Sequence, residues 1–265
     1  MRKNNRREER IGLERLNNQD SLMKVLVYNN AHDIVVEFQD AYKTKIHTQW
    51  TNFIRGNVKN PYAPSVLGVG IIGLKYNTVN KVKNIKEYDL WYDMLERCYD
   101  KKCKEKYPAY KNATCCKEWL NFENFYEWLN SQENFKKWHD EERWCLDKDI
   151  IFKGNKIYSP KTCCLVSNRV SCLFTKNDSR RGDYPIGVIY NKKVEKYVAR
   201  ISKMGDNGKY RECLGYYDTP EQAFQAYKKA KESYIKQVAQ EEYAKGNITK
   251  RCYMAMMNYQ VEITD

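Results

Sequence analysis

Alternating apolar and polar positions are clearest in the last third of the chain. Segments 186–190, 196–201 and 211–216 are rich in β-branched and aromatic residues and are separated by turn residues, which predicts three strands. Successive side chains of a strand point to opposite faces, so we expect one face of the sheet to be buried and the other to meet solvent. In the second strand these faces carry Tyr197, Ala199 and Ile201, and Lys196, Val198 and Arg200, respectively.

A helix is predicted directly after the third strand. Thr219 followed three residues later by Gln222, with Pro220 between them, has the form of a capping box. Small and aromatic residues then recur along one helix face at Ala223, Tyr227, Ala230, Tyr234 and Val238. Residues 179–265 are therefore expected to form a three-stranded sheet packed on one helix.

Helical spacing dominates residues 84–130. Apolar residues recur at i, i+3, i+7 and i+10 over Tyr88, Trp91, Leu95 and Cys98, which predicts one buried helix face. A second helix is predicted after Asn121, whose side chain suits the N-cap position.

Residues 143–174 predict a ββα unit. We expect a strand at 144–152, a turn at 153–156 and a return strand at 157–158. Ser159 at the N-cap and Pro160 at the first helical position predict that the helix begins there. Residues 81–178 would then form a helical and ββα domain.

The first third of the chain predicts a small β module over residues 23–80, preceded by a basic tail at 1–22. Strands are expected at 24–28, 34–38 and 42–46. A short helix at 47–55 would turn Trp50, Phe53 and Ile54 inward and end at Gly56. The fold class expected for the whole chain is therefore α+β.

The composition indicates the class of binding partner more clearly than it indicates the fold. The 265 residues carry a formal net charge of +13, and 14% of them are aromatic, which favours a folded protein that attracts polyanions. No apolar run follows the basic N-terminus as in a signal peptide, and none is long enough to span a membrane. We therefore expect no membrane partner and a cytoplasmic location.

Two cofactor classes are not expected from the motifs. The ten cysteines include no Cys-x-x-Cys pair, so buried thiols are favoured over a zinc site. Residues 68–73 fit the string G-x-G-x-x-G, but no helical pattern follows them. A glycine-rich connector is therefore favoured over a nucleotide-cofactor site.

The solvent face of the C-terminal sheet is a candidate DNA-binding surface. A small sheet can enter the major groove, where arginine binds guanine edges through two hydrogen bonds. A solvated charged face is the alternative interpretation. The candidate residues on this face and its turn are Lys192, Lys193, Lys196, Arg200 and Arg211, with Tyr190 nearby.

About 60 residues resemble the Apetala/ethylene-response-factor type of DNA-binding domain. The resemblance rests on residues 184–188 (YPIGV), 196–201 (KYVARI) and 214–223 (LGYYDTPEQA). It implies that double-stranded DNA is bound through the three-stranded sheet.

The middle of the chain resembles the core of HNH nucleases, as in phage homing-endonuclease-like proteins. The resemblance rests on residues 146–150 (LDKDI), 154–155 (GN), 158–160 (YSP) and 162–163 (TC). It extends upstream through Trp91, Met94, Leu95, Arg97, Cys98, Tyr99 and Trp119. In that family an Apetala-type domain follows the nuclease core, so the resemblance implies a DNA-binding endonuclease of a phage or prophage, acting in the bacterial host cytoplasm.

The resemblance also implies roles for individual residues, with one departure. Asp147 and Asp149 would hold Mg²⁺ or another divalent metal, Asn155 would orient the loop or a phosphate, and Lys148 would touch phosphate. Lys148 stands where the family has the histidine that acts as general base, and lysine is a poor base unless its pKa is strongly lowered. His139 is close in the sequence and is a second candidate base, but a lone surface histidine is the favoured interpretation.

Three hypotheses remain open from the sequence. If the strand turns both aspartates toward the site, they can hold metal and the unit can cut DNA. If it turns Lys148 there, the unit binds phosphate without cutting, which suits a non-catalytic DNA-binding regulator. The third hypothesis is a phage protein that inhibits a host defence factor, with a host protein as partner.

Overall fold

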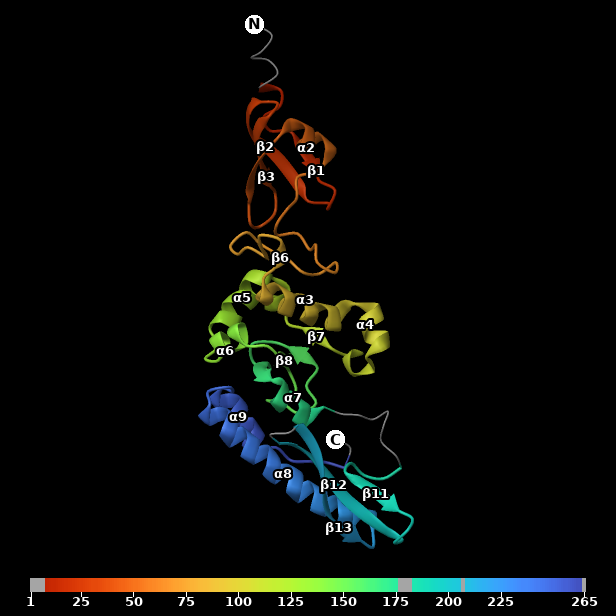
Figure 1. Cartoon of the computed structure of the whole chain (residues 1–265). Coiled ribbons are helices and arrows are strands. Elements are labelled where there is room, and N and C mark those ends of the chain that lie inside the picture. Colours follow the sequence, from red (N-terminus) through yellow and green to blue (C-terminus); the bar gives the residue numbers. More distant parts are fainter. Residues whose placement is uncertain (1–7, 176–182, 206–207, 264–265) are drawn as a thin grey trace. The chain divides into compact units, whose positions relative to one another are not determined.

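The computed structural model describes residues 8–175, 183–205 and 208–263, and it confirms the α+β class (Figure 1). The chain divides into two compact units. One comprises Met1–Ile85 and Leu120–Phe125, and the other comprises Lys86–Trp119 and Tyr126–Asp265.

An antiparallel sheet of four strands forms the first unit. The strands β1 (Glu14–Leu16), β2 (Leu22–Asn30), β3 (Asp33–Phe38) and β4 (Lys45–Thr48) pair in sequence order. Burial alternates along β3, and the core between the sheet and helix α2 (Trp50–Arg55) includes Met23, Val25, Ile34, Val36, Phe38 and Phe53. The helix ends at Gly56, whose φ of 69° is a conformation that glycine adopts without strain. This ending agrees with the prediction.

The expectation of a tail over residues 1–22 is wrong for the part that the structure describes. Strand β1 pairs with the first residues of β2. Asn17 is buried, accepts hydrogen bonds at Oδ1 from the backbone of Gln19 and Ser21, and donates from Nδ2 to the carbonyl of Val58. All three residues of β1 are exposed, so this strand has no hydrophobic pattern that sequence reasoning could detect.

Two smaller expectations for the first unit also need correction. Ile54 is exposed rather than turned inward, because Phe53 takes the buried face of the six-residue helix α2. The third predicted strand begins at Lys45 rather than at residue 42, because Asp40 accepts hydrogen bonds from the backbone of Tyr42 and Lys43 and forms a turn there. After Gly73 the chain forms only the two-residue strands β5 (Val79–Asn80) and β6 (Lys83–Asn84) before the next helix.

The helices that the sequence predicts over residues 84–130 follow strand β6. Helix α3 (Lys86–Tyr99) buries Trp91, Leu95 and Cys98, and Trp91 Nε1 donates to the carbonyl of Trp119 at 2.7 Å. The helix α4 (Lys101–Lys106), the 3₁₀ turns η1 (Pro108–Tyr110) and η2 (Lys117–Leu120), and the helices α5 (Phe122–Asn130) and α6 (Phe135–Asp140) follow. Asn121 accepts from the backbone N–H of Glu123 at 2.8 Å, as predicted for an N-cap.

The ββα unit forms, but with different elements from those predicted. Strand β8 (Trp144–Asp147) pairs antiparallel with β10 (Cys164–Ser167), and helix α7 (Asn168–Phe174) follows. Strand β9 (Ile157–Tyr158) pairs instead with β7 (Thr114–Cys115), in parallel. The predicted pairing of β8 with β9 is therefore wrong.

The predicted helix start at Ser159 and Pro160 is also wrong. The backbone N–H groups of Thr162 and Cys163 both bond the carbonyl of Ser159, which closes a turn rather than a helix. Four consecutive residues from Cys163 to Val166 are then buried, and strand β10 begins at the second of them, Cys164. Helix α7 begins only after Ser167.

The C-terminal part forms the predicted sheet and helix. Strands β11 (Val188–Asn191), β12 (Lys196–Gly205) and β13 (Gly208–Tyr217) make an antiparallel sheet, and α8 (Pro220–Ala244) packs on one of its faces (Figure 1). Thr219 Oγ1 accepts from the backbone N–H of Gln222 at 3.2 Å, as the capping box predicts. Helix α9 (Lys250–Met257) packs against α8.

One hydrophobic core connects the ββα unit with the C-terminal sheet. Ile150, Cys164, Val166 and Val170 belong to the same cluster of buried residues as the strands and helices of residues 183–263. The domain boundary expected at residue 178 lies outside the described residues, and the described residues on both sides of it belong to one compact unit.

Candidate functional site

The candidate DNA-binding surface is built by the register of the C-terminal sheet. Residues directly opposite each other on antiparallel strands point to the same face. Tyr197, Ala199 and Ile201 pack toward α8, so the alternate residues of β12 point away from it. Arg200 is exposed there as predicted, whereas Val198 is fully buried, which corrects the expectation that it meets solvent. The pairs on that outward face are Val198 with Ile189 and Tyr216, Arg200 with Cys213, Ser202 with Arg211, and Met204 with Lys209.

Three basic side chains cluster on this outward face. Arg200, Arg211 and Lys209 are exposed and lie on two adjacent strands. Within the described part of the chain, none of the three has a carboxylate oxygen within 4 Å. Their positive charge is therefore not compensated by a neighbouring acid. Lys209 is absent from the sequence-based candidates because β13 begins at Gly208, three residues before the strand expected from the sequence.

The remaining predicted lysines lie at one end of the sheet. Lys192 and Lys193 are exposed in the turn between β11 and β12, where Asn191 Oδ1 accepts from the backbone N–H of Lys193. Lys196 forms an ion pair with Asp218. The two turn lysines can approach a polyanion directly, whereas Lys196 would first have to exchange its partner.

Tyr190 belongs to the other face of the sheet. It is paired with Tyr197, which packs on the side of α8. The ring centroids of Tyr190 and Tyr197 are 5.1 Å apart, and Tyr184 lies 5.3 Å from Tyr197. Tyr190 therefore does not share the outward face with Arg200 and Arg211, which corrects its expected grouping with those residues. Tyr216 is the exposed tyrosine of the outward face.

The second candidate site is the loop that follows β8. The strand ends at Asp147, and the Oδ1 atom of Asp147 accepts from the backbone N–H groups of Asp149 at 2.7 Å and Ile150 at 3.0 Å. Because the chain turns here, strand alternation does not extend to residues 148 and 149, and the alternation expected to place both aspartates on one face is wrong. Burial raises the pKa of Asp147.

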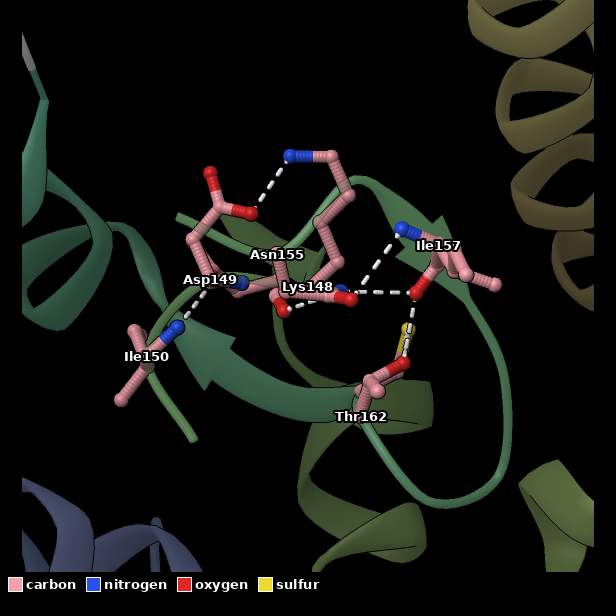
Figure 2. Close-up of polar contacts among 8 residues, drawn as sticks. Lys148, Asp149, Ile150, Asn155, Ile157 and Thr162 are labelled. Atoms are coloured by element: carbon pink, nitrogen blue, oxygen red, sulfur yellow. Dashed lines mark hydrogen bonds and ion pairs between the residues drawn. The ribbon is translucent and has the colours of Figure 1, made fainter. Parts of the chain in front are cut away.

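Lys148 is the buried cation of this loop. Its side chain is only 6% exposed, and Nζ lies 2.5 Å from Asp149 Oδ1, whose side chain is 43% exposed (Figure 2). The ammonium group also lies 5.7 Å from the centre of the Tyr158 ring. The loop therefore holds a positive charge against one of the two carboxylates that the sequence suggests as metal ligands.

Asn155 connects the two ends of the same loop. Its Nδ2 donates to the backbone carbonyls of Lys148 at 2.9 Å and Ile157 at 2.8 Å, and Thr162 Oγ1 also donates to the carbonyl of Ile157 (Figure 2). The Asn155 amide thus fixes the path of the loop by bonding its backbone. The arrangement matches the first of its two expected roles, orientation of the loop.

A divalent metal does not fit Asp147 and Asp149 as they are arranged. One oxygen of Asp147 accepts two backbone hydrogen bonds, and one oxygen of Asp149 contacts the Lys148 ammonium. Within the described residues, no group of three or more histidine, cysteine, aspartate or glutamate side chains is arranged to hold a metal ion. His139, the alternative base, lies beside Asp140 and Glu87 on α6 and α3. We derive no metal-dependent step from these residues.

A half-buried cation, Arg97, contacts Tyr158 from helix α3. Burial alone would lower the pKa of Arg97, but its hydrogen bond to Tyr158 and the nearby Tyr110 raise it above the usual value. The Arg97 guanidinium lies 5.6 Å from the centre of the Tyr110 ring. Tyr158 thus lies between the two cations Arg97 and Lys148, a grouping that spacing along the chain does not reveal.

The ten cysteines are all free thiols. Cys98, Cys163, Cys164 and Cys252 are buried, whereas Cys172 and Cys213 are exposed. Burial raises the pKa of both Cys98 and Cys163 to about 12. These two thiols are therefore protonated at neutral pH and inert as nucleophiles.

Comparison of the chain with family models, with curated proteins and with solved structures finds no match. In the described part of the chain, no helix combines the length and the apolar character needed to cross a membrane.

Proposed function

We propose that this protein binds double-stranded DNA through the outward face of strands β12 and β13. The observation that carries the proposal is the cluster of Arg200, Arg211 and Lys209, which lies on two adjacent strands without acidic partners in the described residues. The net charge of +13 supports it at long range, because polyanions are attracted before contact.

The dimensions of the sheet are compatible with the proposal. Strand β11 pairs only with residues 196–199 of β12, so β12 and β13 continue beyond it as a two-stranded ribbon. The major groove is about 12 Å wide and admits such a ribbon. Arg200 and Arg211 lie on this ribbon, from which their guanidinium groups can reach guanine edges. The resemblance to Apetala-type domains implies binding through the three-stranded sheet to which this ribbon belongs.

The proposal predicts a specific loss on substitution. In fluorescence anisotropy with random-sequence duplexes of about 30 base pairs, Arg200→Ala and Arg211→Ala should each weaken binding by about 1–3 kcal/mol. Selection from a pool of random duplexes should give a less defined motif for each variant. Lys229→Ala, at an exposed position on α8, is the matched control and should bind as the unchanged protein does. Unchanged binding by the double arginine variant would refute the proposal.

DNA cleavage is the second candidate function. The observation that favours it is the order of β8, β10 and α7, which form a ββα unit as the resemblance to HNH nucleases implies. The ion pair of Lys148 with Asp149 argues against it, because a built-in ammonium group competes with a metal ion for the same carboxylate.

Incubation with supercoiled plasmid and Mg²⁺ or Mn²⁺ separates the two functions. We expect binding in a gel shift without nicking of the plasmid. Nicking that disappears in both Asp147→Ala and Asp149→Ala would instead establish a metal-dependent nuclease and overturn this expectation.

A further inference from the structure

A pocket of about 320 Å³ lies where strand β12 extends beyond its partner β11. One wall is formed by the strands, with Arg200 and Ser202 on β12 and Lys209 on β13. Other residues that line the pocket belong to α7 and α8, including Phe174, Tyr227 and Tyr234. The pocket has the size of a small-ligand site.

The described side chains that line the pocket carry only positive charge. Its basic residues are Arg169, Arg200, Lys203, Lys209 and Lys231, and neither aspartate nor glutamate is among the described residues that line it. A concave site with several cations and low-dielectric walls concentrates anions. The chemistry of the lining therefore selects an anionic ligand.

Two of these cations are held in place by acids behind them. Arg169 contacts Glu241 at 2.6 Å and Glu242 at 2.9 Å, and Lys203 Nζ lies 2.6 Å from Glu212. Arg169 and Lys203 thus line the pocket, but the glutamates compensate their positive charge. Arg200 and Lys209 have no carboxylate within 4 Å in the described part of the chain, so they supply the uncompensated positive charge.

The strand wall is held in place by a hydrogen bond from the helix side. The hydroxyl of Tyr234 accepts from the backbone N–H of Met204 at 2.8 Å, which fastens the end of β12 to α8. Lys203 Nζ also lies 5.8 Å from the centre of the Tyr234 ring. An anion would therefore meet a pocket whose walls are already formed, so little ordering is needed on binding.

We infer that this pocket binds a phosphate group, with Lys209 as its contact and Arg200 as a second uncompensated charge in the lining. Lysine binds phosphate as a point charge and arginine binds it through paired N–H groups. Arg200 belongs both to the outward face of the sheet and to the lining of the pocket, so a DNA strand bound on that face would lie beside the pocket. If the bound phosphate belongs to the DNA backbone, the inference rests on the proposed function. A free nucleotide would bring the same chemistry.

Lys209→Met is the decisive variant, because Lys209 is exposed and its loss leaves the core intact. Duplex affinity is measured by anisotropy across a series of salt concentrations. A backbone phosphate contact predicts that Lys209→Met binds all sequences about threefold to tenfold more weakly and lowers the salt slope by about 1. Lys209→Arg should restore most of the affinity, and Lys229→Met should change neither quantity.

A second experiment tests whether the pocket binds a free phosphate compound. Inorganic phosphate and deoxyadenosine 5′-monophosphate are titrated into the unchanged protein and into Lys209→Met by calorimetry. Binding of either compound that Lys209→Met abolishes, without an effect on duplex affinity, supports the phosphate site and assigns it to a free phosphate ligand. If Lys209→Met changes neither duplex binding nor phosphate binding, the inference is overturned while the DNA-binding proposal stands. If the unchanged protein binds no duplex but binds the nucleotide, the proposed function fails and the pocket site stands.

Discussion

At the scale of single residues, side-chain chemistry could be predicted better than orientation. Arg200 and Arg211 were expected on the solvent face, and they lie there. Tyr190 was grouped with these residues only because it is close to them in the sequence. The register of β11 with β12 places it on the other face of the sheet. Alternation predicts faces within one strand, whereas the register between strands depends on contacts that one sequence does not show.

Lys148 and Asp149 form a pair whose members differ in burial. The Lys148 side chain is 6% exposed and that of Asp149 is 43% exposed. If Asp149 is removed, a buried ammonium group loses its only carboxylate contact in the described residues. If Lys148 is replaced by an apolar side chain of similar length, the remaining carboxylate is still hydrated.

We therefore expect Asp149→Ala to destabilise the protein by about 1–3 kcal/mol. Lys148→Met should change the free energy of unfolding by less than about 1 kcal/mol, because apolar replacement of a buried ion pair is often neutral. Urea denaturation followed by circular dichroism measures both values. If Lys148→Met lowers the free energy of unfolding more than Asp149→Ala does, this expectation is contradicted. The fold would then require the ammonium group of Lys148 itself.

At the scale of elements, long periodic segments were predictable and short apolar runs were not. Helix α3 and the start of α8 at Thr219 follow the predicted spacing and capping. Residues 163–166 are apolar without a period, and a run of this length suits a buried strand as well as a helix. Ser159 and Pro160 then favoured the helix, but the run forms β10, because its residues pair with β8 inside the core.

The same limit applies to the candidate metal site. The resemblance to HNH nucleases places Asp147, Lys148 and Asp149 in one functional segment, and the structure does bring them into one loop with Asn155. Whether a residue at the end of a strand continues its alternation depends on where the strand stops. That point is set by the two backbone hydrogen bonds to Asp147.

At the scale of the whole molecule, the ββα unit and the C-terminal sheet share a core, and an ionic contact between α7 and α8 also joins them. Arg169 on α7 contacts Glu241 and Glu242 on α8, and Ser167 also donates to Glu242. The Glu242 side chain is only 4% exposed, so its charge depends on Arg169 for compensation.

Arg169→Met should therefore destabilise the second unit by about 3–5 kcal/mol, because it leaves a buried carboxylate without its cation. The double variant Arg169→Met with Glu242→Gln should recover a large part of this loss, since no buried charge remains. Thermal unfolding of the three proteins provides the comparison. Equal destabilisation of the single and double variants would contradict the role of the buried charge.

The shared core also has a consequence for synthesis of the chain. Cys252, Met256 and Val261 pack in the same cluster as Ile150, Cys164 and Val170, and Asn134 donates to the carbonyl of Asn247, 113 residues later. On the ribosome, part of the apolar surface of the ββα unit stays uncovered after Phe174 until the 83 residues from there to Met257, the end of α9, have emerged. We therefore expect nascent chains that stall before α9 to need chaperones, whereas the four-stranded sheet of the first unit can close much earlier.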